Sequence, residues 1–138
     1  MTVSWQSRTY RPGDGDGLRA LWTAAGFRLI GDDDAGLGRF AARNPGLLLV
    51  AEDGPSLVGS AMGAWDGRRG WIYHVTAAPA YRRHGLATEL VGRVEAGLRE
   101  LGCQRVLVIV EAANDPAMAF WASQGYEVRD TRHMAKTL

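Results

Sequence analysis

A short basic stretch of the chain, Tyr81–Thr88, carries residue types that could bind an anion. It holds two adjacent arginines and a histidine, followed at once by Gly85. An apolar, β-branched and aromatic segment, Trp71–Ala77, precedes it as a predicted strand, and from Leu86 onward apolar residues recur at helical spacing. A turn between a strand and a helix points unpaired N–H groups and the positive end of the helix dipole at one place. The sequence therefore predicts a phosphate or pyrophosphate site, which the glycine lets a ligand approach closely.

At these residues the chain resembles a known family. Arg82–Ala87 fits the Q/R-x-x-G-x-G/A motif of the GNAT N-acetyltransferases, which binds the pyrophosphate of acetyl-coenzyme A. The lead-in Val75–Tyr81 resembles the same family, and so does Asn114–Trp121, which is followed by Gln124-Gly125-Tyr126. Two motifs in the family's order, about thirty residues apart, are far more specific than a lone glycine pattern. The resemblance covers nearly the whole chain and is weakest before residue 45.

The resemblance implies acetyl-CoA as co-substrate, held in part by the backbone. The strand Trp71–Ala77 would separate from the next strand, Arg105–Val110, and pair with the pantetheine arm as with a peptide. A backbone N–H near Val75 or Ala77 could then polarise the thioester carbonyl. The cofactor-binding residues that the resemblance implies are Val75, Thr76, Ala77, Arg82, Arg83, His84, Gly85, Leu86, Ala87, Thr88, Asn114, Phe120 and Trp121.

Amine acetylation also needs a group that removes a proton, because an alkyl ammonium has a pKa near ~10.4 and must be neutral to attack. The family position for this base falls on Ile109, which cannot serve, so Glu111, two residues on, is the candidate. His74 is interpreted as structural, because strand alternation places it on the face opposite to Trp71 and Tyr73.

The leaving thiolate often takes its proton from a family tyrosine, but this chain has Trp121 there, and an indole cannot supply one. Tyr73 is the candidate replacement acid. Packing within the sheet is its alternative role, and catalysis by proximity and water is a further alternative.

Aromatic side chains are the candidates for binding the acceptor amine. Trp22, Phe27 and Trp71 are the candidate substrate-binding residues, with core packing as the alternative for Trp22 and Phe27. Asp32–Asp34 could attract a cationic amine, but an acidic first turn of a helix explains the same run.

The pattern of elements predicts an α/β fold, as a single GNAT-like domain over residues 1–138. We expect a mixed, mostly antiparallel central sheet of six to seven strands flanked by about four helices. The expected strands span residues 5–10, 46–52, 56–65, 71–77, 105–110, 126–132 and 133–137. The nearly continuous β-branched run 105–110 is expected to be a central strand buried on both faces. The expected helices begin near residues 18, 34, 86 and 116, and Asp14 or Asp16 would cap the first.

Composition narrows the partners. The 138 residues fit one domain, and a net charge of +1 gives no general footprint for nucleic acid. A single cysteine suits a reducing cytosol, and no apolar run approaches the ~20 residues of a membrane span. We therefore expect a cytoplasmic protein that needs no metal and binds neither nucleic acid nor membrane. Open edges of the C-terminal strands would favour a homodimer.

Three functions are compatible with these residues. The first is an acetyl-CoA-dependent N-acetyltransferase acting on a small amine or an exposed peptide amine. The second is a catalytically weak acyl-CoA-binding or regulatory module, which Trp121 and Ile109 would favour. The third is a different phosphate binder, against which stands the absence of a Walker-type lysine and of a dinucleotide fingerprint.

Overall fold

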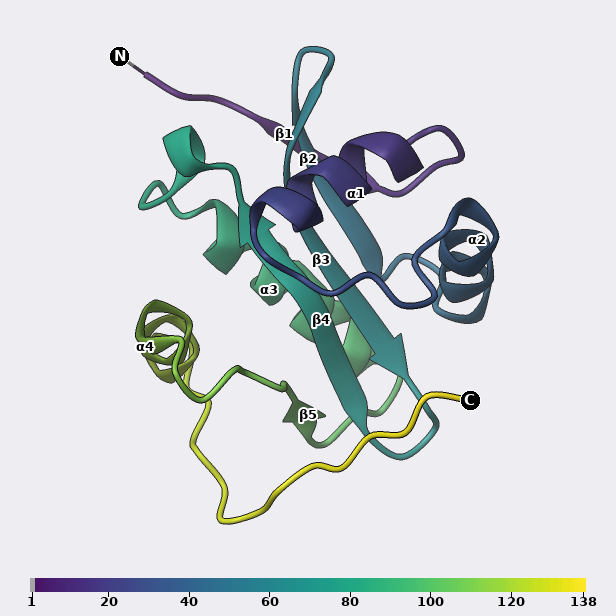
Figure 1. Ribbon diagram of the computed structural model, residues 1–138, viewed down its shortest axis with the longest axis vertical. Coiled ribbons are helices and arrows are strands. Elements are labelled where there is room, and N and C mark those ends of the chain that lie inside the picture. Colours follow the sequence, from purple (N-terminus) through teal and green to yellow (C-terminus); the bar gives the residue numbers. More distant parts are fainter. Residues whose placement is uncertain (1) are drawn as a thin grey trace. The chain divides into compact units, whose positions relative to one another are not determined.

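The computed structural model describes residues 2–138, which form two compact units that divide after Val108. The elements of the first unit (Figure 1) are β1 (Gln6–Thr9), α1 (Gly15–Ala24), α2 (Asp34–Arg43), β2 (Leu48–Asp53), β3 (Ser56–Trp65), β4 (Gly70–Ala77), the 3-10 turn η1 (Pro79–Tyr81), α3 (Leu86–Glu100) and β5 (Val106–Leu107). The second unit holds α4 (Asp115–Ser123). Within residues 2–138, no helix is both long and apolar enough to cross a bilayer.

The sheet runs β1-β2-β3-β4-β5 in sequence order. The first four strands pair antiparallel, and β5 pairs parallel to β4 after the crossover through α3. The predicted α/β class, with its mixed and mostly antiparallel sheet and four helices, is confirmed. The strand number is five, below the six to seven expected.

Two expected strands are missing, and a third is shorter than expected. Arg105–Val110 was expected to be central and buried on both faces, but only Val106 and Leu107 pair, at the edge of the sheet, and both are half-buried. The segments 126–132 and 133–137 contain no strand. Their apolar residues face solvent instead, as the 78% exposed Val128 and 96% exposed Met134 show. An alternating pattern is compatible with a strand but cannot supply the partner that a strand needs.

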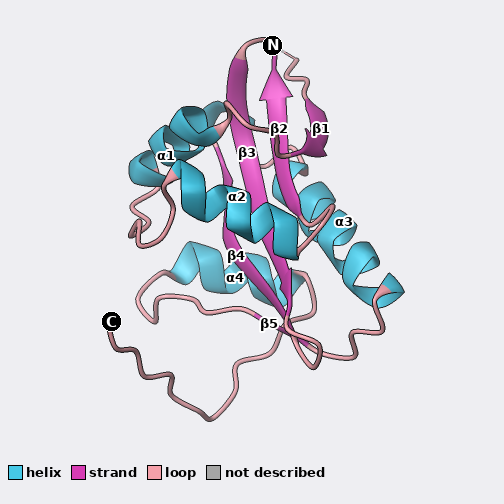
Figure 2. Ribbon diagram, turned by 90° about the vertical axis from the view of Figure 1, so that its right-hand side faces the viewer, coloured by secondary structure: helices cyan, strands magenta, loops and turns pink. Residues whose placement is uncertain are grey.

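Helices cover both faces of the sheet in the first unit (Figure 2). On one face α1 and α2 enclose a buried core formed by Leu18, Trp22, Leu37, Leu48, Val50 and Met62. On the other face α3 lies against glycines of β3 and β4. A Cβ atom on Gly59 would come within 2.4 Å of Leu86, and one on Gly63 within 2.5 Å of Val94. Missing side chains in the strands thus let α3 approach the sheet closely, and its first turn is held over the end of β4.

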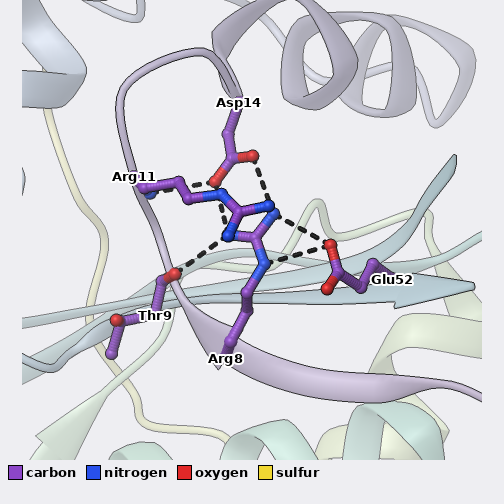
Figure 3. A network of polar contacts seen from close by, with 5 residues as sticks. All are labelled: Arg8, Thr9, Arg11, Asp14 and Glu52. Carbon is purple, nitrogen blue, oxygen red and sulfur yellow. Dashed lines mark hydrogen bonds and ion pairs between the residues drawn. The ribbon is translucent and has the colours of Figure 1, made fainter. Parts of the chain in front are cut away.

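The start of α1 is fixed by an arginine from β1 (Figure 3). Both oxygens of Asp14 accept hydrogen bonds from Arg8, at 2.8 and 2.9 Å, and Arg8 also bonds Glu52 of β2. Asp14 stands at the cap position of α1, but its side chain makes no capping bond there and accepts the backbone N–H of Arg11 instead. Asp33 does cap α2, accepting the backbone N–H of Gly36 at 2.8 Å.

Candidate functional site

The basic loop connects η1 to α3 and is tied at its base. Arg82 donates from Nε to the carbonyl oxygen of Ala77 at 3.1 Å, which holds the first arginine against the end of β4. The hydroxyl of Tyr81 donates to the carboxylate of Asp53 at the end of β2. That hydrogen bond, with some burial, raises the pKa of the Tyr81 hydroxyl. The loop is therefore anchored to two strands while Arg83, His84 and Gly85 are exposed.

The backbone of this loop has the conformation of an anion site. Arg83 has φ 63° and Gly85 has φ 85°, both in the left-handed region. Gly85 is the residue before α3, and no side chain caps the helix there. Left-handed residues beside a helix N-terminus present several N–H groups to one point, and an anion satisfies them. The geometry fits the predicted pyrophosphate site from Arg82 to the first turn of α3, which contains Leu86, Ala87 and Thr88.

The strand that leads into the loop has an open edge. β5 pairs with β4 only at Gly70 and Trp71. From Ile72 to Ala77, no strand of the described residues pairs with that side of β4. Val75, Thr76 and Ala77 therefore lie on a stretch whose outer backbone groups can accept an extended ligand.

A β-bulge interrupts β4 just before this stretch. Met62 of β3 pairs with Tyr73 and Ser60 pairs with Thr76, so Ala61 faces two residues, His74 and Val75. His74 takes up the extra residue with φ 48°. The bulge reverses alternation at this point and turns the imidazole of His74 toward α1, on the face that also carries Trp71 and Tyr73. The expectation that His74 lies on the opposite face is wrong for this reason.

The ring of His74 is enclosed by aromatic side chains. Its centroid lies 4.6 Å from that of Trp22 and 4.9 Å from that of Phe27, with the Phe27 ring nearly parallel at 12°. Its Nε2 lies 3.0 Å from the carboxylate oxygen Oδ2 of Asp32. Trp22 is completely buried and donates its indole N–H to Ser60, so it packs on the inner side of the His74 ring. Phe27 is half-buried and is in part accessible to solvent.

Tyr73 and Trp71 continue the same face toward the β3–β4 turn. Their rings stack at 6.4 Å with an angle of 4°, and Phe40 of α2 meets Tyr73 edge-on. The indole N–H of Trp71 donates to Asp66 at 3.3 Å. Partial burial, followed by the charge of Asp66, raises the pKa of Tyr73, so its phenol holds its proton at neutral pH. Two aromatic rings and a carboxylate are thus grouped near the open edge of β4.

The remaining predicted residues belong to the second unit. Glu111 is exposed, and Asn114 caps α4 by accepting the backbone N–H of Ala117 at 3.1 Å. Trp121 meets Phe120 and Tyr126, each edge-on, with ring centroids 5.1 and 4.9 Å apart. The roles of Glu111, Asn114, Phe120 and Trp121 toward the cofactor remain predictions.

Comparison with known proteins defines the class to which this fold and loop belong. The model of the acetyltransferase (GNAT) family matches residues 4–126, and the chain belongs to this family. An acetyltransferase of Yersinia pestis (strain Pestoides F) is 33% identical over 132 residues, which cover 95% of this chain and 94% of that protein. The protein is therefore an acetyltransferase.

Solved structures agree with this family. Naa20 of Chaetomium thermophilum, in complex with a bisubstrate analogue, is 26% identical with a TM-score of 0.79, over 89% of this chain and 71% of that chain. The PaiA N-acetyltransferase of Thermoplasma acidophilum, in complex with coenzyme A, shares the fold with a TM-score of 0.80 and 18% identity, over 94% of each chain.

The sequence did not reveal the pairing of His74 with Asp32. The two residues are 42 positions apart, and the aspartate stands in an acidic run whose neighbours cap α2. Regular strand alternation predicted that the side chain of His74 lies on the face opposite to Tyr73. Only the bulge brings it to the face with Phe27 and Tyr73, and the sequence of β4 carries no glycine or proline that would have indicated a bulge there.

Proposed function

We propose that the protein transfers an acetyl group from acetyl-CoA to a primary amine of a small molecule or peptide, by direct attack in a ternary complex. One observation carries the proposal. The unpaired edge of β4 leads directly into a loop with two left-handed residues and an uncapped helix N-terminus. An extended thiol arm and a pyrophosphate need these two features in this order.

The residues present fit acetyl-CoA. Val75 and Ala77 would pair with the pantetheine arm through their backbone groups, while Arg82, Arg83 and the first turn of α3 would hold the pyrophosphate. Arg83 is exposed and its side chain makes no ion pair with the described residues, so its guanidinium can turn to a phosphate without breaking one. Bound acetyl-CoA supplies the acyl group as an activated thioester.

Tyr73 supports the proton transfer to the leaving thiolate. Its raised pKa keeps the hydroxyl protonated at neutral pH, and it is 38% exposed on the face of the bulge. A protonated phenol can donate its proton to a departing sulfur, which is the role that the resemblance implies for the family's tyrosine. Tyr73 is therefore our candidate acid. Glu111 remains the candidate base that the sequence offers.

The same face indicates the kind of acceptor. Phe27, Trp71 and Tyr73 give it apolar surface, and Asp66 adds a negative charge whose pKa is lowered by hydrogen bonds from the backbone N–H groups of Arg69 and Arg68. An ammonium group attached to an apolar or aromatic body suits this combination. Trp22 has no exposed surface, so its contribution to acceptor binding would be indirect.

A catalytically weak acyl-CoA-binding module is the second candidate. Trp121 favours it, because its indole packs between Phe120 and Tyr126 and has no proton to give to a thiolate. Such a module would bind acetyl-CoA as an enzyme does but would not turn it over.

An assay with defined amines separates the two candidates. The purified chain is incubated with acetyl-CoA and, in turn, benzylamine, aniline, spermidine and a peptide with a free N-terminus. Free coenzyme A thiol and acetylated product are both measured. Stoichiometric appearance of both with at least one amine supports transfer in a ternary complex. Binding of acetyl-CoA without acetylation of any of these amines contradicts an enzymatic role for this site and favours the module.

A further inference from the structure

His74 and Asp32 form a dyad that the proposed reaction has not yet used. Nε2 of His74 lies 3.0 Å from Oδ2 of Asp32, and the two side chains are only 19% and 12% exposed. A carboxylate that accepts from one imidazole nitrogen fixes the tautomer and directs the lone pair of the other nitrogen outward. This is the arrangement by which a histidine is prepared to take up a proton.

The structure holds this ring in one orientation. Trp22 and Phe27 pack against the ring at centroid distances of 4.6 and 4.9 Å. The main chain of His74 is also fixed, because its carbonyl oxygen accepts the hydroxyl of Ser60 at 2.7 Å. Aromatic contacts, a carboxylate and a buried hydroxyl therefore all act on one residue of the bulge, whose left-handed φ of 48° is uncommon outside glycine.

The second ring nitrogen, Nδ1, is open. It has no hydrogen-bond partner among the described residues, where Nε2 makes the only polar contact of this ring. Every buried side-chain nitrogen or oxygen of the described residues does have a partner. Nδ1 is therefore not completely buried, and a water molecule can contact it. A histidine with a purely structural role would have no need of an accessible nitrogen.

No other charged group of the described residues contacts the ring. Arg19 of α1 donates to the backbone oxygen of Asp32, at 3.2 Å, and to the carboxylate of Asp34, not to the imidazole. The remaining ionisable groups of the α1–α2 loop are Arg28 and Asp33, and Asp33 is engaged in capping α2. β3 has no ionisable side chain. Within β4 the other ionisable side chain is Tyr73, and α3 covers the opposite face of the sheet.

We propose that His74 is the general base that removes the proton of the acceptor ammonium, and that Asp32 is the residue that positions it. This inference rests on the proposed function, because it places the reacting carbonyl beside the backbone of Val75, the next residue of the bulge. It replaces Glu111 in that role with a residue of the first unit.

The proton balance of the step is simple. Nδ1 of His74 takes one proton from the ammonium, and the nitrogen lone pair forms a bond to the acetyl carbon as the bond from carbon to sulfur breaks. The thiolate leaves with that electron pair and is protonated by Tyr73 or water. The amide nitrogen loses its second proton to solvent, the imidazolium returns its own to solvent, and the Tyr73 phenolate, where it forms, regains its proton from solvent.

Two amines of similar size test the base directly. Benzylamine is protonated at neutral pH and must lose a proton before attack, whereas aniline is already neutral. We expect His74→Gln to lower kcat/KM for benzylamine by about 100-fold or more at neutral pH and to lower the value for aniline far less. In the same variant the acidic limb of the pH profile with benzylamine should move to higher pH, because the rate then follows the ionisation of the amine itself.

Asp32→Asn keeps the aromatic packing of the His74 ring and is the second test variant if His74→Gln does not fold. We expect it to lower kcat/KM for benzylamine by about tenfold and to shift the acidic limb, again with a smaller effect on aniline. Asp34→Asn is the matched control, because Asp34 lies on the same acidic run, is largely exposed and pairs with Arg19 rather than His74. Its pH profile should match the wild type.

The outcomes separate this inference from the proposed function. An equal loss for both amines, or an unchanged acidic limb in the variants, would show a structural dyad and overturn the inference, with acetyl transfer still standing. Wild-type turnover of aniline but not of benzylamine would also overturn the role of His74 as the base and leave acetyl transfer standing. Wild-type turnover of neither amine nor of the other acceptors named above would contradict the proposed function itself.

Discussion

The buried hydroxyl of Ser60 donates a hydrogen bond of 2.7 Å to the carbonyl oxygen of His74. The hydroxyl oxygen of Ser60 in turn accepts the indole N–H of Trp22 at 2.8 Å. One side chain of β3 thus links α1 to the bulge of β4. This link fixes the backbone position of His74 within the bulge.

Replacing Ser60 by alanine should be costly for its size. The change leaves the indole N–H of Trp22 without an acceptor in a site that has no exposed surface. An unsatisfied buried donor costs about 1–3 kcal/mol, so we expect urea unfolding of Ser60→Ala to show a loss of about 2 kcal/mol. Ser56→Ala, an exposed position of the same strand, is the control and should unfold like the wild type. Equal stability of all three proteins would refute the linking role of Ser60.

The close approach of α3 to the sheet predicts opposite effects of one substitution at two glycines. A Cβ on Gly63 would meet Val94 at 2.5 Å and Leu47 at 3.2 Å, so Gly63→Ala should destabilise by about 1–3 kcal/mol. Gly92 lies within α3 with nothing within 4 Å of the added Cβ. Gly92→Ala should therefore stabilise by about 0.5–1 kcal/mol. Thermal or urea unfolding would measure both, and a tolerated Gly63→Ala would mean that α3 does not need this contact.

Gly85 and Gly67 form a matched pair for the cofactor loop. Both have left-handed φ, 85° and 92°, and an added Cβ meets nothing within 4 Å at either position. Alanine at either position should cost about 1–2 kcal/mol of stability, because only the backbone conformation is penalised. Gly85→Ala alone should weaken the binding of acetyl-CoA, since its Cβ would lie where the backbone approaches the pyrophosphate in the proposed site. The thermal shift produced by increasing acetyl-CoA measures this, and equal shifts in both variants would argue against the loop as the site.

Asp14 should make stability depend on acid pH. Burial tends to raise the pKa of this carboxyl, but hydrogen bonds from Arg8 and from the backbone of Arg11 outweigh it, and the pKa is lowered. A lowered folded pKa means that the stabilisation is fully present above the ordinary value near ~3.9 and is lost as the pH falls through the folded pKa. Asp14→Asn should cost about 2 kcal/mol at neutral pH, and the difference from wild type should shrink below about pH 4.

A second carboxylate nearby provides the control for this effect. Asp16 pairs with Arg19, but its side chain is fully exposed. Asp16→Asn should therefore change urea unfolding little at any pH. If Asp14→Asn behaved in the same way, the ion pairs of Figure 3 would contribute nothing measurable.

The sequence predicted the regular elements of the first unit well where composition and periodicity agree. The glycine-containing turn before Leu86 and the helical stripe that follows it appear in the structure as expected. Strands 48–53, 56–65 and 70–77 lie within about two residues of their expected bounds. Local signals sufficed here because each element carries its own stop, a glycine or a proline.

Features that depend on a distant partner could not be predicted. The apolar run at Arg105–Val110 looked like a buried central strand, yet pairing needs a neighbour and ends after Leu107. The position of His74 depends on Ser60 and Trp22 as much as on its own strand. One inserted residue in a strand moves the following side chains to the other face of the sheet. For this reason His74, for which the sequence predicted a structural role, became the candidate general base.

The proposed acetyl transfer depends most on the binding of acetyl-CoA at the loop Arg82–Gly85, and calorimetric titration tests this binding directly. Wild-type protein, Arg83→Glu and Arg93→Glu are compared, the last being the same charge reversal at an exposed position farther along α3. We predict saturable one-to-one binding to the wild type and to Arg93→Glu, and at least about tenfold weaker binding to Arg83→Glu, since one charge-assisted phosphate contact contributes about 1.5–3 kcal/mol. No heat of binding to the folded wild type, or equal affinity in all three proteins, would contradict the account.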